Sequence, residues 1–119
     1  MIFLSAQPDE IYFLWQLQLQ LANFHSSGIP AEQIHVLIGY RPKRGLHPAF
    51  RRLAEESRKA CFFFYEDTRI RPAYLSSIRP HLIAKHYAAH PEMAEETICY
   101  HDSDILFHHQ PDWPVLLAD

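Results

Sequence analysis

The chain has 119 residues, of which 48% are hydrophobic and 21% are charged, and its formal net charge is -3 with histidine neutral. This length predicts one domain, residues 1–119, with a single core of sheet and helices. The modest negative charge excludes a general attraction to nucleic acid or to an anionic membrane surface. The sequence has no run of about 18 apolar residues, so it contains no candidate membrane span.

The two cysteines, Cys61 and Cys99, each lie in an apolar segment that has no second cysteine nearby. Buried, reduced thiols are typical of cytoplasmic proteins, which predicts that location. The apolar start of the chain is too short for the core of a signal peptide and has no basic flank. We therefore expect residues 2–4 to begin a first strand that ends near Pro8.

The first half of the chain predicts a strand, a helix, a second strand and a second helix. Residues 15–21 alternate Leu with Gln, as in a half-buried strand, but Leu14, Leu17, Leu21 and Phe24 also fit a helical stripe. Since Leu, Gln and Ala favour helix, we expect a helix from Glu10 to about residue 25. The next segments are a continuous β-branched strand at 34–40 and a helix over 47–59 that starts at a proline.

The second half continues the alternation. We expect a third strand at 61–65, a third helix at 81–90 with Pro80 near its first turn, and a fourth strand at 97–100. Trp15 and the run 62–64 are expected in the core. The pattern predicts an α/β fold with three layers: a mostly parallel, four-stranded sheet with helices on both faces, joined by right-handed crossovers.

Ligands of such open sheets bind beyond the carboxyl ends of the strands, where the strand order reverses. By this rule, the segments at the carboxyl ends of the four predicted strands lie near one another at one edge of the sheet. These segments are polar and comprise residues 5–7, 40–41, 66–67 and 101–104. The sequence contains neither G-x-G-x-x-G nor G-x-x-x-x-G-K-[ST], which excludes the usual dinucleotide fingerprint and phosphate loop. Charge on a bound phosphate would then be neutralised by a metal ion or by Arg and Lys.

Asp102 and Asp104 leave the fourth predicted strand one residue apart, with apolar residues on both sides. Carboxylate oxygens are the ligands that Mg²⁺ and Mn²⁺ prefer, usually together with substrate phosphates. Ser103 adds a hydroxyl on the opposite side. The segment therefore predicts a divalent metal site that holds a diphosphate. His101, His108 and His109 follow the same strand, and we expect them to be exposed rather than metal ligands.

The segment Tyr100-His101-Asp102-Ser103-Asp104-Ile105-Leu106-Phe107 resembles the D-x-D motif of nucleotide-sugar-dependent glycosyltransferases with the A-type (GT-A) fold. Upstream, residues 1–5 resemble the first nucleotide-contacting strand of that fold. Residues Tyr74 to Pro80, with Lys85, are similar to the segment that leads into the helix before the motif. The resemblance implies that the chain is the N-terminal, nucleotide-binding half of such an enzyme.

The resemblance also implies roles for individual residues. Asp102 and Asp104 would bind Mn²⁺ or Mg²⁺, and the metal would bridge the diphosphate of a nucleotide sugar, with a UDP-sugar as the expected donor. The remaining contacts to the nucleotide sugar would come from Ser5, Ala6, Gln7, Asp67, Arg79, Lys85, Asp102 and Ser103. The family's acceptor-binding half and downstream metal-ligating histidine have no counterpart before Asp119, so we expect a fragment or truncated form, and neither a catalytic residue nor an acceptor is assigned.

Two other classes stay open. The first is a Mg²⁺-dependent phosphohydrolase or phosphotransferase, in which the first Asp of the pair is a nucleophile, although such enzymes place the pair after their first strand. The second is a non-catalytic, truncated α/β domain whose acidic pair is a solvated turn and whose exposed apolar surface leads to self-association. Single residues also have purely structural alternatives: Asp67 could end its strand as a turn former or cap, and Arg79 and Lys85 could be solvated helix residues that pair with nearby acids.

Overall fold

The computed structural model describes residues 1–70 and 77–118 of the chain. Strands and helices alternate from the start. Their bounds are β1 Ile2–Pro8, α1 Ile11–Ser26, β2 Ile34–Tyr40, α2 Pro48–Ser57, β3 Cys61–Glu66, α3 Ile78–Ala89, β4 Ile98–Tyr100 and α4 Trp113–Leu116, with short 3-10 turns at Ala31–Gln33 and Pro91–Glu95.

The four strands form one parallel sheet in the order β3-β2-β1-β4. In the register, Phe3 of β1 lies between Ile34 of β2 and Cys99 of β4. The chain builds β1, β2 and β3 outward in one direction and then returns to place β4 on the other side of β1. The predicted α/β fold with a parallel four-stranded sheet is confirmed, and the strand order reverses between β1 and β4.

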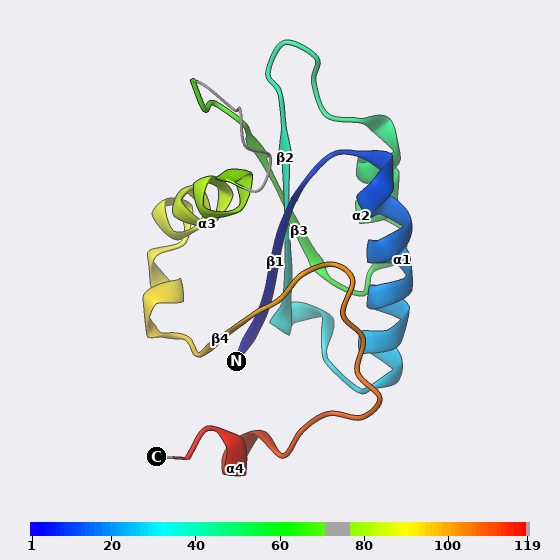
Figure 1. Cartoon of the computed structure of the whole chain (residues 1–119), viewed down its shortest axis with the longest axis vertical. Helices are drawn as coiled ribbons and strands as arrows, with labels where there is room; N and C mark the ends of the chain where they lie inside the picture. Colours follow the sequence, from blue (N-terminus) through cyan, green and yellow to red (C-terminus); the bar gives the residue numbers. More distant parts are fainter. Residues whose placement is uncertain (71–76, 119) are drawn as a thin grey trace.

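The helices cover both faces of the sheet (Figure 1), with α1 and α2 on one face and α3 on the other. Strand residues alternate between these faces, as the pleat requires. Phe3 and Val36 belong to the core beneath α1 and α2, whereas Leu4 and Leu37 belong to the core beneath α3. The resulting three layers leave the carboxyl ends of the strands uncovered by helices.

Helix α3 packs closely against β2 at Gly39. A Cβ atom at this position would come within 2.9 Å of the Ile78 and Leu82 side chains. Real Cβ atoms do not come this close, because packed protein interiors leave no room for an additional carbon. The absence of a side chain at Gly39 is therefore what lets α3 lie flat against this end of the sheet.

Helix α1 resolves the ambiguous run of alternating Leu and Gln. Leu17, Leu21 and Phe24 are buried at helical spacing, and the expectation of a helix is confirmed. Trp15, by contrast, is 54% exposed, so its predicted place in the core is wrong. A buried stripe at positions 17, 21 and 24 turns position 15 toward solvent because each helical residue rotates by about 100°.

A chain of three hydrogen-bonded side chains lies beneath α3. His86, on α3, is fully buried. Its Nδ1 is 2.7 Å from the Tyr65 hydroxyl, and its Nε2 is 3.0 Å from Nδ1 of His35. Burial, together with the neighbouring His35 and His90, lowers the pKa of His86 to about 4. His86 is therefore neutral in the folded protein at pH 7.

We expect the free energy of unfolding to fall by on the order of 2–3 kcal/mol as the pH is lowered from about 6.5 to 4. In this window the unfolded chain binds a proton at His86 and the folded chain does not, so stability is fully present above the ordinary pKa and is lost below it. Urea unfolding at several pH values measures this slope. His86→Gln keeps a neutral hydrogen-bonding side chain without titrating, and it should flatten the profile. An unchanged slope in that variant would contradict the assignment.

Among residues 1–70 and 77–118, the structure contains no helix with the length and hydrophobicity needed to span a membrane.

Candidate functional site

The predicted acidic pair lies at the point where the strand order reverses. Strand β4 pairs with β1 up to Leu4 and Tyr100, and the next amide, of His101, donates a hydrogen bond to the carbonyl of Leu4 at 3.0 Å. Asp102 therefore comes directly after the last pairing of the edge strand with the central strand. This is the position at which open parallel sheets bind ligands.

The turn that follows β4 points both carboxylates outward. Asp102 and Asp104 are exposed, whereas Ser103 between them is only 6% exposed. The hydroxyl of Ser103 donates a hydrogen bond of 2.6 Å to Oε1 of Gln16 on α1. Because Ser103 is fixed against the helix, its two neighbours face solvent on the same side.

Two further side chains of α1 hold this turn by its backbone. The Nε2 of Gln20 donates to the carbonyl oxygens of Asp102 and Ile105, at 2.8 and 2.9 Å. One helical turn later, Asn23 donates to the carbonyl of Phe107 and accepts from its amide, at 2.9 and 2.8 Å. Figure 1 shows the resulting path, in which the chain leaves β4 and runs down along α1. The turn is thus clamped to a helix rather than projecting as a free loop.

The two carboxylates line a cavity of about 180 Å³ with Arg79 from α3 and residues of the first turns of α1. The Nη1 atom of Arg79 lies 2.7 Å from Oδ1 of Asp102. Both side chains are partly exposed to solvent, Arg79 at 33% and Asp102 at 48%. Asp104 makes no hydrogen bond or ion pair with any residue in the described part of the chain. The cavity therefore offers one unpaired carboxylate, one paired carboxylate and one cation.

The acidic pair by itself does not form a complete set of protein ligands for a metal ion. Within residues 1–70 and 77–118 no group of three or more His, Cys, Asp or Glu side chains is arranged to hold a metal ion. Mg²⁺ characteristically keeps several waters and binds through one or two carboxylates plus substrate phosphates. Asp104 and Asp102 are the residues that would hold it, and Arg79, released from Asp102, would then face the phosphates.

Asp67 lies at a second cavity on the same edge, beyond the ends of β1, β2 and β3. This cavity measures about 370 Å³ and includes the side chains of Asp9, Arg41, Arg44 and Arg69. Asp67 is 3% exposed and accepts hydrogen bonds from Nε and Nη2 of Arg69, both at 2.8 Å. These bonds with Arg69 hold the pKa of Asp67 well below its usual range. Asp67 is thus an ionised anchor for arginines, and Arg41 and Arg44 are the exposed groups that a ligand would meet.

Asp9, at the end of β1, anchors this cavity in the same way. Its carboxylate is 2% exposed, pairs with Arg44 and accepts a hydrogen bond of 2.8 Å from the amide of His47. The loop between β2 and α2 is thereby tied to the end of β1. Two buried aspartates therefore fix the arginines of neighbouring loops over one hollow.

The remaining predicted contacts are not at the surface of either cavity. Ser5, Ala6 and Gln7 are 0%, 4% and 1% exposed, and Gln7 donates to the carbonyl of Leu37 at 2.8 Å. The residues that reach the edge from β1 are instead Pro8 and Asp9. Lys85 donates to the carbonyl of Glu66 at the end of β3. Of the predicted segment Tyr74–Pro80, residues 74–76 lie outside the described residues.

The three histidines after β4 differ. His108 and His109 are exposed, as expected, but His101 is 7% exposed, which the sequence did not lead us to expect. Its ring packs edge-on against Phe24 with centroids 5.2 Å apart, and its Nδ1 is 2.9 Å from the carbonyl of Asp102. Burial lowers its pKa. His101 therefore helps to seat the turn and does not face the carboxylates.

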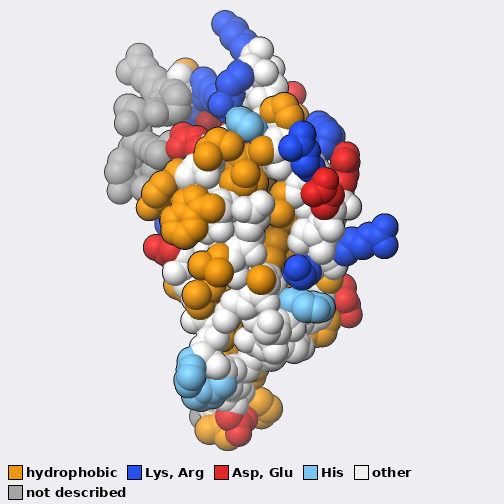
Figure 2. Space-filling model, turned by 90° about the vertical axis from the view of Figure 1, so that its right-hand side faces the viewer, with side chains coloured by type: hydrophobic (Ala, Val, Ile, Leu, Met, Phe, Trp, Pro, Cys, Tyr) orange, Lys and Arg blue, Asp and Glu red, His pale blue; other side chains and the backbone are white. Residues whose placement is uncertain are grey.

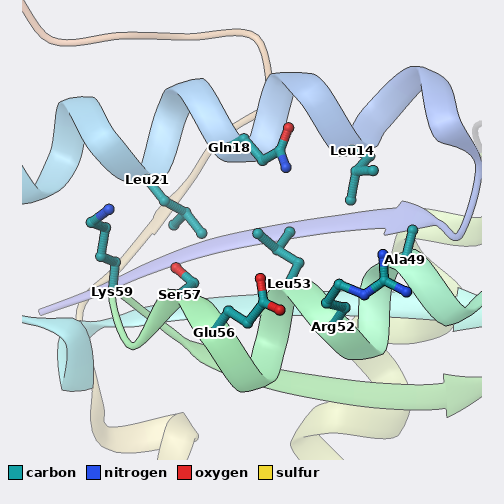
Figure 3. Close-up of a pocket in the computed structure, with 9 residues that line it drawn as sticks. All are labelled: Leu14, Gln18, Leu21, Ala49, Arg52, Leu53, Glu56, Ser57 and Lys59. Carbon is teal, nitrogen blue, oxygen red and sulfur yellow. The ribbon is translucent and has the colours of Figure 1, made fainter.

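A separate hollow lies between α1 and α2 (Figure 3). Leu14, Leu21 and Leu53 point toward one another at its floor, and Arg52 and Lys59 are among the polar side chains at its rim. Its volume is about 300 Å³, but it includes none of the predicted site residues. It lies between two helices that cover the sheet rather than at the strand ends, so it does not belong to the site.

Comparisons of the chain with protein-family models, with curated proteins and with solved structures found no match.

Proposed function

We propose that the chain binds a nucleotide-diphosphate sugar through a divalent metal held by Asp102 and Asp104, as the donor-binding part of a glycosyltransferase. The observation that carries this proposal is that two exposed aspartates line one cavity where the strand order of a parallel sheet reverses. The D-x-D resemblance of the sequence supports the same function.

The charges at the cavity support a diphosphate as the bound group. A metal ion bridging two phosphates neutralises charge that develops when the sugar bond breaks. Arg79 adds a guanidinium, whose planar fork matches phosphate oxygens. This guanidinium pairs with Asp102, so it already lies beside the carboxylate that would hold the metal and within the same cavity.

Calorimetric titration with UDP and GDP, with and without Mg²⁺ or Mn²⁺, tests the proposal. We expect binding that requires the metal and that weakens at least about ten-fold in Asp104→Asn, because this variant removes the unpaired carboxylate. The control is Glu55→Gln, which removes the same charge from an exposed position on α2. Binding that is indifferent to both the metal and Asp104, or no binding at all, would defeat the proposal.

The phosphohydrolase alternative has a distinct readout. We expect no phosphate release from an aryl phosphate in the presence of Mg²⁺. In the proposed donor site Asp102 binds the metal and does not act as a nucleophile. Metal-dependent phosphate release that is lost in Asp102→Asn would favour that alternative over sugar-nucleotide binding.

A further inference from the structure

A small amphipathic pocket adjoins the acidic pair on the side away from the arginine cavity. It has a volume of about 160 Å³, and Trp15, Leu19 and Leu106 form its apolar walls. These three side chains are 54%, 52% and 50% exposed. Figure 2, which views the molecule from the side of α1 and α2, shows hydrophobic side chains gathered on this surface. Asp104 and Ser103 complete the pocket with polar atoms.

Gln16 lies where this pocket and the cavity of the acidic pair meet, and it lines both. Its side chain is 6% exposed, and its Oε1 is used by the hydroxyl of Ser103. Its Nε2, in contrast, has no hydrogen-bond partner in the described part of the chain. Although the residue as a whole is largely buried, its Nε2 atom is open to solvent, so its N–H groups can donate to a ligand or to water. The junction therefore provides a donor for a ligand oxygen.

The three hollows follow one another along the start of α1. The arginine cavity includes Glu10, the acidic cavity includes Tyr12 and Gln16, and the apolar pocket includes Gln16 and Leu19. A ligand with a central diphosphate at the acidic pair would thus extend in two directions. The arginine cavity, at about 370 Å³, has roughly twice the volume of the apolar pocket, at about 160 Å³.

We infer, on the basis of the proposed function, that the sugar ring of the donor occupies the pocket of Trp15, Leu19 and Leu106, and that the nucleoside occupies the arginine cavity. A nucleoside is larger than a single pyranose, and we therefore assign it to the larger cavity. A pyranose has apolar C–H faces and hydroxyls at its edge. It thus complements an indole wall on one side and Asp104 with the Gln16 amide on the other.

Titration of the whole chain with UDP and with UDP-glucose, in Mg²⁺, tests the inference. Mg²⁺ is used because paramagnetic Mn²⁺ quenches tryptophan fluorescence. We expect UDP-glucose to change the tryptophan emission and UDP alone to leave it nearly unchanged, and we expect the change to be lost in Trp15→Ala, which retains Trp113. In Trp15→Ala, UDP-glucose should bind roughly three- to ten-fold more weakly while the affinity for UDP stays the same. Ile11→Ala, a substitution of another exposed apolar residue of α1, should change neither affinity.

The outcomes separate the inference from the proposed function. Metal-dependent binding of UDP, with UDP-glucose affinity unaffected by Trp15→Ala, would overturn the sugar pocket and leave the proposed function standing. An equal loss for UDP and UDP-glucose would also overturn it, because Trp15 would then contact the nucleotide. Absence of any UDP binding would overturn the proposed function and the inference together.

Discussion

Replacement of Gln20 by leucine is expected to weaken Mg²⁺-dependent binding of UDP by at least about ten-fold. Gln20 donates to the carbonyls of both Asp102 and Ile105, so it closes the turn that carries the acidic pair. Leucine fills a similar volume but leaves both carbonyls without this donor, and the turn then samples geometries in which the carboxylates diverge. A loss of affinity of about ten-fold is the size expected when the two carboxylates are slightly displaced, because both must reach the same metal ion.

Asn23→Leu provides the matched control for Gln20→Leu. Asn23 also makes two hydrogen bonds from α1 to the same segment, but both reach Phe107, beyond the carboxylates. We expect each variant to lower the free energy of unfolding by about 1–3 kcal/mol, and only Gln20→Leu to lower the affinity for UDP. Calorimetry and urea unfolding measure the two quantities separately. Equal affinities in the two variants would show that Gln20 has no positioning role.

Asp67→Asn is expected to cause a large loss of stability, about 3 kcal/mol. The carboxylate is 3% exposed and receives two side-chain hydrogen bonds from Arg69, which is itself only 12% exposed. The variant leaves a largely buried guanidinium opposite a neutral amide, and removing one partner of a buried pair is strongly destabilising. Because the folded pKa of Asp67 is depressed, its contribution is present above the ordinary carboxyl pKa and is lost as the pH falls below it.

Asp102→Asn tests whether this effect comes from burial. Asp102 also pairs with an arginine, Arg79, at 2.7 Å, but both members of this pair are partly exposed. Surface pairs contribute about 0–1 kcal/mol, so urea unfolding should show a much smaller change for this variant than for Asp67→Asn. Similar losses of unfolding free energy in the two variants would contradict the expectation that the burial of Asp67 causes the larger effect.

The sequence predicted the strands and helices because their signals are local. The strand at 34–40 is recovered with the same bounds, and α1 follows from helix-forming residues despite the alternating Leu and Gln. The bounds of α3 differ more: the structure begins this helix at Ile78, three residues before the prediction, with Pro80 within the first turn. Proline is compatible with that position because the first amides of a helix have no partner within it.

The acidic pair was predicted, but the residues that hold it were not. Gln16 and Gln20 bond to groups 87 and 82 residues away in the chain, and such contacts depend on where the return from β3 to β4 places the edge strand. One signal was present: Gln16, Gln20 and Asn23 recur at helical spacing on one side of α1. Polar residues at that spacing usually face solvent, so the pattern alone does not indicate a buried clamp.

The clamp on the segment after β4 has one consequence for how this region tolerates change. Gln20 and Asn23 bond to main-chain atoms of Asp102, Ile105 and Phe107. Every amino acid except proline supplies the same main-chain atoms. Substitution of Leu106, which lines the neighbouring pocket, can therefore reshape that pocket while the segment stays bonded to α1, so the walls of the pocket can vary without loss of the fold.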